Sequence, residues 1–226
     1  MAAPASPNPV AFDEADLDGA LTAILERGRS TVGGADEMSV TLLYGADADT
    51  AVSTGPLAVL LDEWQYQEGH GPCLDAATFA ATITVADLRT EARWPSWTRR
   101  AVEAGAGSCM AVGLRLPHGI PGSLNLYAHV RAAFSPGAAI AAQALAGNIA
   151  VLLAIADEDD RYALPRHRQA TTHHRAVIDQ AKQLLLRHWQ CTGKEAFGML
   201  AAQAHTTGRP VHEVAAALVR RLSVNP

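Results

Sequence analysis

The charge of this chain divides sharply near residue 160, and the division limits how the chain can fold. Residues 1–160 contain eight of the 18 Lys and Arg residues and 20 of the 23 Asp and Glu residues, a net charge of −12. Residues 161–226 contain the other ten basic residues and three acidic residues, a net charge of +7. The acidic run 157–160 marks the boundary, and Pro165, which interrupts a helix or begins one, follows it. We therefore predict two units, which 226 residues are enough to form.

The basic unit has the composition of a module that binds a polyanion. Six of the nine histidines lie in it together with the ten basic residues. Such clustering is typical of proteins whose partner is a nucleic acid. The alternative is a helical surface that is basic only to remain solvated. Charge alone leaves both interpretations open.

The rest of the composition favours a cytoplasmic protein. The three cysteines are widely spaced and form no C-x-x-C pair, which indicates a reducing compartment. Residues 1–11 have neither the basic nor the apolar segment of a signal peptide, and we predict a flexible tail there. The most apolar stretch, 138–156, is interrupted by Gln143 and Asn148 and is expected to be a packed helix. We expect no membrane association.

The acidic unit alternates between helical and strand periodicity. A Gly- and Pro-rich segment at 117–122 predicts a hairpin-like connection between its last two strands. The pattern predicts an α+β fold, with a mainly antiparallel sheet flanked by helices. The expected helices are 12–28, 56–67, 94–104 and 135–155, and the expected strands are 39–44, 50–54, 82–85, 108–116 and 123–130.

The basic unit is predicted to contain three helices. The first has an apolar stripe from Val177 to Trp189, and the third begins near Pro210. The second opens with Thr192 and Glu195 at the spacing of a capping box, in which each side chain bonds the other residue's backbone N–H. About 60 residues form a marginal core alone, so we expect the first helix to pack also on a partner chain in a homodimer.

The basic unit resembles the ANTAR domain over residues 165–223. The resemblance rests on the segment 175–182 (RAVIDQAK), on Glu195-Ala196-Phe197 and on Val214-Ala215. It implies a three-helix module of transcription antiterminators that binds RNA, as a dimer, at tandem stem-loops in leader transcripts. Gln183 and Ala204 depart from the family, which prefers Gly and Ser there. The residues expected to contact RNA are Arg175, Ala181, Lys182, Gln183, His205, Thr207, Arg209 and His212, with a core position as the alternative for Ala181.

The acidic unit resembles a GAF domain over residues 12–156, with 157–164 as a linker. The segment 62–73 (DEWQYQEGHGPC) is similar to one typical of actinobacterial regulators that join GAF and ANTAR domains. The resemblance implies a sensor of a small molecule or of redox state. We assign Trp64, Cys73 and Trp94 to a ligand site, with Cys73 near its mouth, although the tryptophans could instead fill the core. No cofactor is predicted beyond such an unidentified ligand.

We expect neither catalysis nor a metal site. The chain has no Gly-rich phosphate loop, no Ser/His/Asp order and no paired acid motif. Free methionine sulfoxide reductases share the GAF scaffold, but their set of cysteines has no match here. His173 and His174 point about 100° apart on a helix, and His167 lies two turns from His174, so these histidines do not share one ion.

The sequence therefore predicts a signal-responsive, RNA-binding regulator of transcription antitermination. The main alternative is a sensor whose basic helices dock an acidic protein partner. A third possibility is a module that binds DNA, which fits the charge but not the family pattern.

Overall fold

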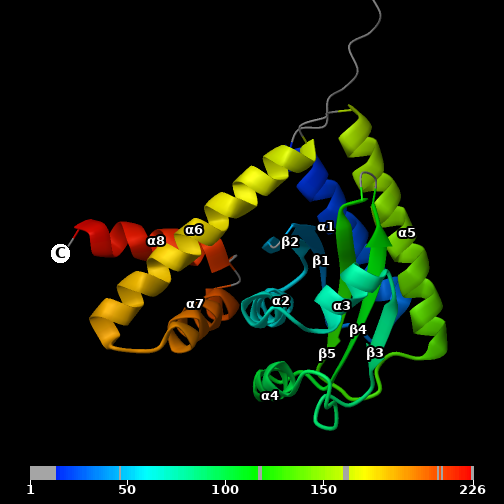
Figure 1. The fold of residues 1–226 in the computed structure, drawn as a ribbon, viewed down its shortest axis with the longest axis horizontal. Helices are drawn as coiled ribbons and strands as arrows, with labels where there is room; N and C mark the ends of the chain where they lie inside the picture. Colours follow the sequence, from blue (N-terminus) through cyan, green and yellow to red (C-terminus); the bar gives the residue numbers. More distant parts are fainter. Residues whose placement is uncertain are drawn as a thin grey trace, which may run out of the picture.

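The computed structural model describes residues 14–45, 47–116, 119–159, 163–207, 209 and 211–224. Figure 1 shows two units: a sheet covered by helices, and three helices that lie beside it. We call residues 14–159 the N-terminal unit and residues 163–224 the C-terminal unit. The predicted α+β class and the three C-terminal helices are confirmed.

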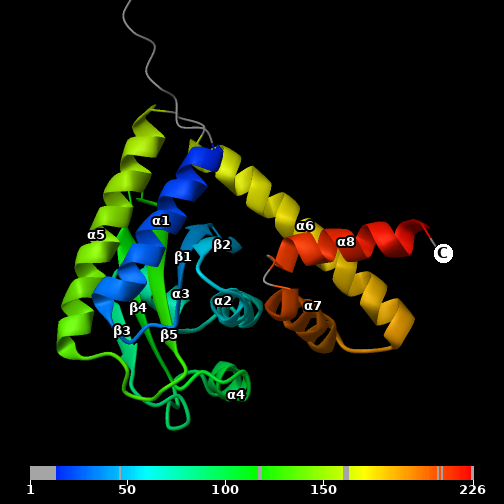
Figure 2. The same cartoon turned by 180° about the vertical axis from the view of Figure 1, so that it is seen from behind.

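A five-stranded antiparallel sheet forms the centre of the N-terminal unit. Its strand order is β2-β1-β5-β4-β3, and every neighbouring pair is antiparallel. Helices α1 and α5 cover one face, whereas α2 and α3 cover the other (Figures 1 and 2). The strands are β1 (Glu37–Tyr44), β2 (Asp47–Ser53), β3 (Thr82–Val85), β4 (Ser108–Arg115) and β5 (Pro121–Ala128). The helices are α1 (Glu14–Val32), α2 (Pro56–Glu68), α3 (Pro72–Phe79), α4 (Pro95–Glu103) and α5 (Pro136–Asp159).

Helix α3 was not predicted from the sequence. The segment 69–72 (GHGP) ends α2, with Gly69 in the left-handed conformation. Pro72 then occupies the first turn of α3, where its missing N–H costs nothing. The same residues therefore end one helix and begin the next.

The hydrophobic core between the sheet and α1/α5 is made by alternating strand residues and by the inner stripes of the two helices. Leu21 and Leu25 of α1 and Ile149 of α5 are fully buried against Met38 and Leu124 of the sheet. Burial of this kind stabilises a fold by about 25 cal/mol per Å² of apolar surface. The α1/α5 face of the sheet therefore holds the N-terminal unit together.

The C-terminal unit consists of α6 (Ala163–Trp189), α7 (Gly193–Thr207) and α8 (Val211–Val224). The predicted capping box is confirmed: the Thr192 N–H donates to Glu195 at 2.7 Å, and the Glu195 N–H donates to the Thr192 hydroxyl at 3.3 Å. Helix α5 reaches Asp159 and α6 begins at Ala163, so both helices extend into the predicted linker 157–164. Pro165 therefore lies in the first turn of α6.

A second hydrophobic cluster joins the two units. It contains Leu61 of α2 and Trp97 of α4, and it continues into Phe197 and Leu200 of α7. Helix α7 contacts α2 directly (Figure 1). Trp97 and Phe197 come from different units, are both fully buried and belong to this one cluster. The two units therefore share part of one hydrophobic core.

Candidate functional site

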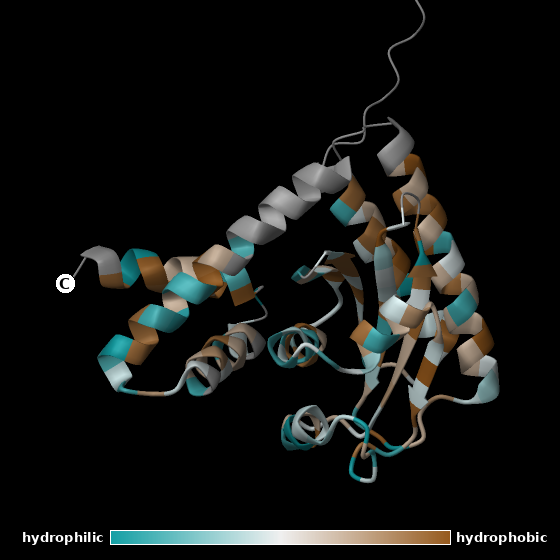
Figure 3. Ribbon diagram, viewed as in Figure 1, coloured by the Kyte–Doolittle hydropathy of each residue, from teal (hydrophilic) through white to brown (hydrophobic). Residues whose placement is uncertain are grey.

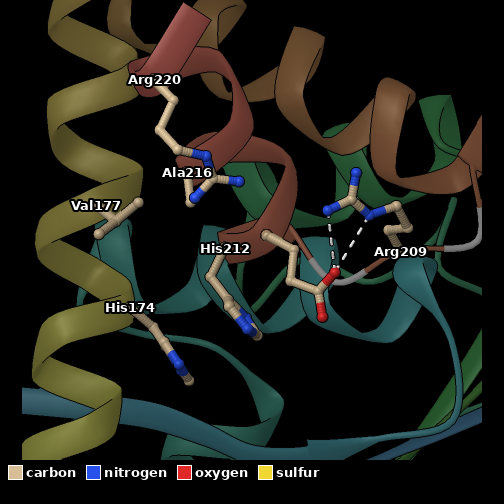
Figure 4. A pocket seen from close by; sticks show the side chains of 7 residues that line it. His174, Val177, Arg209, His212, Ala216 and Arg220 are labelled. Carbon is tan, nitrogen blue, oxygen red and sulfur yellow. Dashed lines mark hydrogen bonds and ion pairs between the residues drawn. The ribbon is translucent and has the colours of Figure 1, made fainter.

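A pocket of about 320 Å³ lies between α6 and α8 in the C-terminal unit (Figure 4). His212, Ala216 and Arg220 are spaced four residues apart on α8, which places them on one face of that helix. Helix α6 contributes His174 and Val177, which are spaced three residues apart. We call this the α6–α8 pocket; its lining residues are His174, Val177, Arg209, His212, Glu213, Ala216 and Arg220.

Two stacked imidazoles form one wall of the α6–α8 pocket. The rings of His174 and His212 lie 3.7 Å apart between centroids and are nearly parallel, at 11°. Burial and, to a smaller extent, the nearby His174 lower the pKa of His212 to about 4, whereas Glu213 acts in the opposite direction. His212 is therefore a neutral ring near pH 7, with one donor and one acceptor nitrogen.

Two guanidinium groups add positive charge to the same pocket. Arg209 forms an ion pair with Glu213 at 3.2 Å, and both side chains are exposed. Such an exposed pair contributes little to stability, so a competing anion can displace it at small cost. Arg220 is also exposed and lines the pocket from α8 (Figure 4). Arginine matches the planar, bidentate geometry of phosphate oxygens, which makes the pocket suited to an anion.

The structure brings together only some of the residues that the sequence assigned to RNA contact. Arg209 and His212 share the α6–α8 pocket. Lys182 lies about 12 Å further along α6 than His174. Its ammonium group pairs with Asp179 at 2.8 Å, and its side chain is 18% exposed.

The other assigned residues are spread over the C-terminal unit. Gln183 is exposed on α6, and Thr207 at the end of α7 donates its hydroxyl to the Gln203 carbonyl at 2.7 Å. Ala181 is fully buried, which favours its alternative as a core residue. The side chains of Arg175 and His205 lie outside the described residues.

The residues assigned to RNA contact did not include Arg220 and His174, which also line the pocket. Arg220 could have been found from its four-residue spacing to Ala216 and His212 on one helix face. His174 could not, because its partner His212 belongs to a different helix and only the packing of α6 on α8 brings the rings together.

A buried carboxyl group lies at the centre of the N-terminal unit. Asp62 of α2 has no exposed surface, and its Oδ1 accepts hydrogen bonds from the Tyr127 hydroxyl at 2.5 Å and from Asn125 Nδ2 at 3.2 Å. Its Oδ2 accepts a bond from the Thr50 hydroxyl at 3.0 Å. Burial raises the pKa of Asp62 to about 7, because these hydrogen bonds offset only part of the loss of solvation.

Gln65 extends this polar network from α2 to the start of α3. Its amide nitrogen donates to the Tyr127 hydroxyl at 3.1 Å, and its Oε1 accepts the Cys73 N–H at 2.7 Å. Gly71 has φ 155°, and a Cβ there would lie 2.3 Å from the Gln65 side chain. Only glycine therefore allows Gln65 to reach the start of α3.

The residues assigned to a ligand site are core residues in this structure. Trp94 donates its indole N–H to Asp75 at 3.0 Å, and the Arg100 guanidinium lies 4.2 Å above the ring of Trp64. Both tryptophans are buried, as the alternative interpretation predicted. Cys73 is fully buried at the start of α3 rather than exposed at an opening. Burial also raises the pKa of the Cys73 thiol well above its usual value, which disfavours the reactive thiolate.

The raised pKa of Asp62 predicts a loss of stability with rising pH. A group whose pKa is higher in the folded than in the unfolded state stabilises the fold below its unfolded pKa, and this contribution is lost as pH rises towards about 7. The free energy of unfolding of the parent protein should therefore fall by up to about 1.4 kcal/mol per pH unit in this range, and Asp62→Asn should remove this pH dependence. Urea denaturation between pH 4.5 and 7.5 measures this slope. The matched control is Asp47→Asn, an exposed residue of β2, and an equal change of slope in both variants would contradict the prediction.

Comparison with known proteins identifies both units. A model of the GAF domain matches residues 14–154, and a model of the ANTAR domain matches residues 166–219. A search of curated proteins found no match.

Solved structures agree on the fold of the N-terminal unit. A GAF domain region from Geobacter sulfurreducens is 14% identical with a TM-score of 0.51, and it covers 62% of this chain and 95% of its own. A GAF domain from Synechocystis in its photoproduct state is 13% identical with a TM-score of 0.54. The match covers 65% of this chain and 98% of that domain. A free methionine-R-sulfoxide reductase from Neisseria meningitidis is 20% identical, and the match covers 66% of this chain and 80% of the reductase. Its TM-score is 0.47, so its activity is not assigned to this chain.

GAF and ANTAR domains are regulatory rather than catalytic, and both are typically soluble. Helix α5 is long and apolar enough to span a membrane by length and composition, but the core helix of a soluble protein meets the same criterion. Since the GAF model covers more than half of the sequence, the family of the chain is established. The chain belongs to the GAF domain family and carries a C-terminal ANTAR domain, which makes it a signal-responsive ANTAR-type regulator.

Proposed function

We propose that this protein binds tandem stem-loops in leader RNA through its ANTAR domain and promotes transcription antitermination. The observation that carries the proposal is the α6–α8 pocket, where two arginines and two histidines converge in the domain family that binds RNA in antitermination. Arg209 and Arg220 contact phosphates in the pocket, while Lys182 and Gln183 provide further RNA contacts on α6 outside it. The net charge of −12 on the GAF side repels RNA and confines it to the basic domain.

RNA affinity is expected to fall steeply with salt. Each single-strand phosphate contact contributes a slope of about −0.7 in the logarithm of the binding constant against the logarithm of salt concentration. Fluorescence polarisation of a labelled tandem-hairpin RNA with the full chain, between 50 and 300 mM KCl, measures that slope. A flat response would remove the electrostatic basis of the proposal. Unlabelled duplex DNA and an acidic peptide, added as competitors, test the two alternative partners.

We also propose that the protein is a cytoplasmic homodimer whose second copy packs on α5. Ile140 and Val151 of this helix are 69% and 59% exposed, and their separation of 11 residues places them on one face. Figure 3 shows that α5 is apolar along much of its length. An exposed apolar stripe of this kind on a soluble domain marks an interaction surface.

Replacing Ile140 and Val151 together by glutamate is expected to convert a dimer into a monomer. The two carboxylates would have to lose their hydration at the interface, and the cost of that desolvation exceeds the gain from the remaining apolar contacts. Sedimentation velocity at several protein concentrations measures the change of mass. Val130→Glu, at an exposed position after β5, is the control. A monomeric parent protein would contradict the proposal.

The signal has a direct route from the GAF domain to the ANTAR domain. Helix α2 carries Asp62 and Gln65 into the buried polar network, and the same helix contacts α7. We infer that a ligand or proton that rearranges this network shifts α2, and that α2 shifts the ANTAR domain.

A further inference from the structure

The α6–α8 pocket places two titratable rings beside two fixed positive charges. His212 stacks on His174 of α6, Arg209 precedes α8, and Arg220 lies two turns further along α8. Among the described residues, Glu213 is the negative charge that lines this pocket, and it pairs with Arg209. Burial and the stacked His174 ring disfavour a positive charge on His212 while the pocket holds no anion.

A bound anion changes that balance. A phosphate oxygen in the pocket attracts the protonated form of an imidazole and screens it from Arg209 and Arg220. A protonated histidine also donates from both ring nitrogens, so it adds a charge-assisted hydrogen bond to the phosphate. The 3.7 Å stack limits the uptake to one proton, because two charged rings at that distance repel each other strongly.

We infer that the α6–α8 pocket is a site for one phosphate group of RNA, and that the His174–His212 pair takes up one proton from solvent when the phosphate binds. This inference rests on the proposed function and adds a regulation to it: acidification tightens RNA binding. The low pKa of His212 in the free protein supports it, since the ring is neutral before binding and has a proton to gain.

The size of the effect follows from linkage. If the loaded pair titrates near the ordinary histidine pKa of about 6.5, uptake of one proton tightens binding about tenfold between pH 7.5 and pH 5.5. The phosphodiesters of RNA remain singly charged across this range, so the proton belongs to the protein. Asp62 titrates in the same range but lies in the GAF domain, and it must be controlled for.

The experiment measures tandem-hairpin RNA affinity of the full chain at pH 5.5, 6.5 and 7.5 at constant ionic strength. The parent protein should bind about tenfold more tightly at pH 5.5 than at pH 7.5. The double variant His174→Gln/His212→Gln should abolish the pH dependence, and the control His188→Gln, at an exposed histidine at the end of α6, should retain it. The same comparison in an Asp62→Asn background removes the titration of the GAF network, so the dependence that remains there is that of the α6–α8 pocket. An affinity that is independent of pH, or a dependence that survives in the double variant in this background, overturns the inference and leaves the proposed function intact.

A second measurement distinguishes a failure of this inference from a failure of the proposed function. The pKa of His212 is read from its ring proton shift by NMR, with and without sulfate, an anion that does not titrate in this range. Sulfate should raise that pKa by at least about one unit, and an unchanged pKa overturns the inference. If no RNA binds at any pH, the proposed function fails, while a rise with sulfate still supports the phosphate site and assigns it to a source other than RNA.

Discussion

Phe197→Ala is expected to lower the free energy of unfolding of the ANTAR domain by about 3–5 kcal/mol. Phe197 is fully buried in α7, in the cluster that continues through Leu61 of α2. Removing the ring takes away its transfer free energy and leaves a cavity that neighbours from two domains would have to fill. A domain of about 60 residues has little stability in reserve, so a loss of this size should unfold it at room temperature.

Urea denaturation followed by circular dichroism measures this effect. The matched control is Met199→Ala on the same helix, where the side chain is exposed and the expected change is below about 0.5 kcal/mol. Because Phe197 belongs to a cluster shared with α2, the variant should also weaken the protection of α2 amides in hydrogen exchange. Equal destabilisation by both substitutions would show that α7 is not packed as described.

The double substitution of Arg209 and Arg220 by alanine is expected to weaken RNA binding by at least about 100-fold at low salt. Each arginine supplies a charge-assisted hydrogen bond to phosphate, worth about 1.5–3 kcal/mol. The salt slope should fall by about 1.4 at the same time, since two phosphate contacts are lost. Folding should be preserved, because both side chains are exposed and the ion pair of Arg209 with Glu213 contributes little to stability.

A control variant that loses the same charge elsewhere distinguishes RNA binding at the α6–α8 pocket from a general electrostatic attraction. Arg27→Ala together with Arg29→Ala removes two positive charges from α1 in the GAF domain. This variant should keep its RNA affinity within about twofold, because its charges lie in the last turns of α1 and do not line the α6–α8 pocket. A similar loss in both double variants would mean that net charge, rather than the α6–α8 pocket, governs binding.

Much of the architecture could be predicted from local sequence patterns. The strand periodicity and the turn-rich segment 117–122 predicted the antiparallel sheet, and the capping box at Thr192 and Glu195 located the start of α7. These features depend on residues a few positions apart, where propensity and hydrogen-bonding capacity act without tertiary context. Helix α3 was missed because Pro72 can follow a break and begin a helix at once.

The sites depended on contacts between distant segments. Asp62 and Tyr127 are 65 residues apart, and no local pattern shows that α2 buries the carboxyl group against β5. Cys73 was expected near an opening, yet the packing of α3 on the sheet buries it completely. Ala181 was assigned to RNA by the family pattern, although the same small side chain suits the interior of a helix bundle.

The sequence by itself determined the two domains, their opposite charges and their families, because these follow from composition, from periodicity and from motifs within single segments. The tertiary structure decided which polar residues meet. It stacks His212 on His174 beside Arg220, and it places Asp62 out of reach of water. The physical reason is that desolvation and charge proximity depend on distances through space, and only the packing of one helix on another sets those distances.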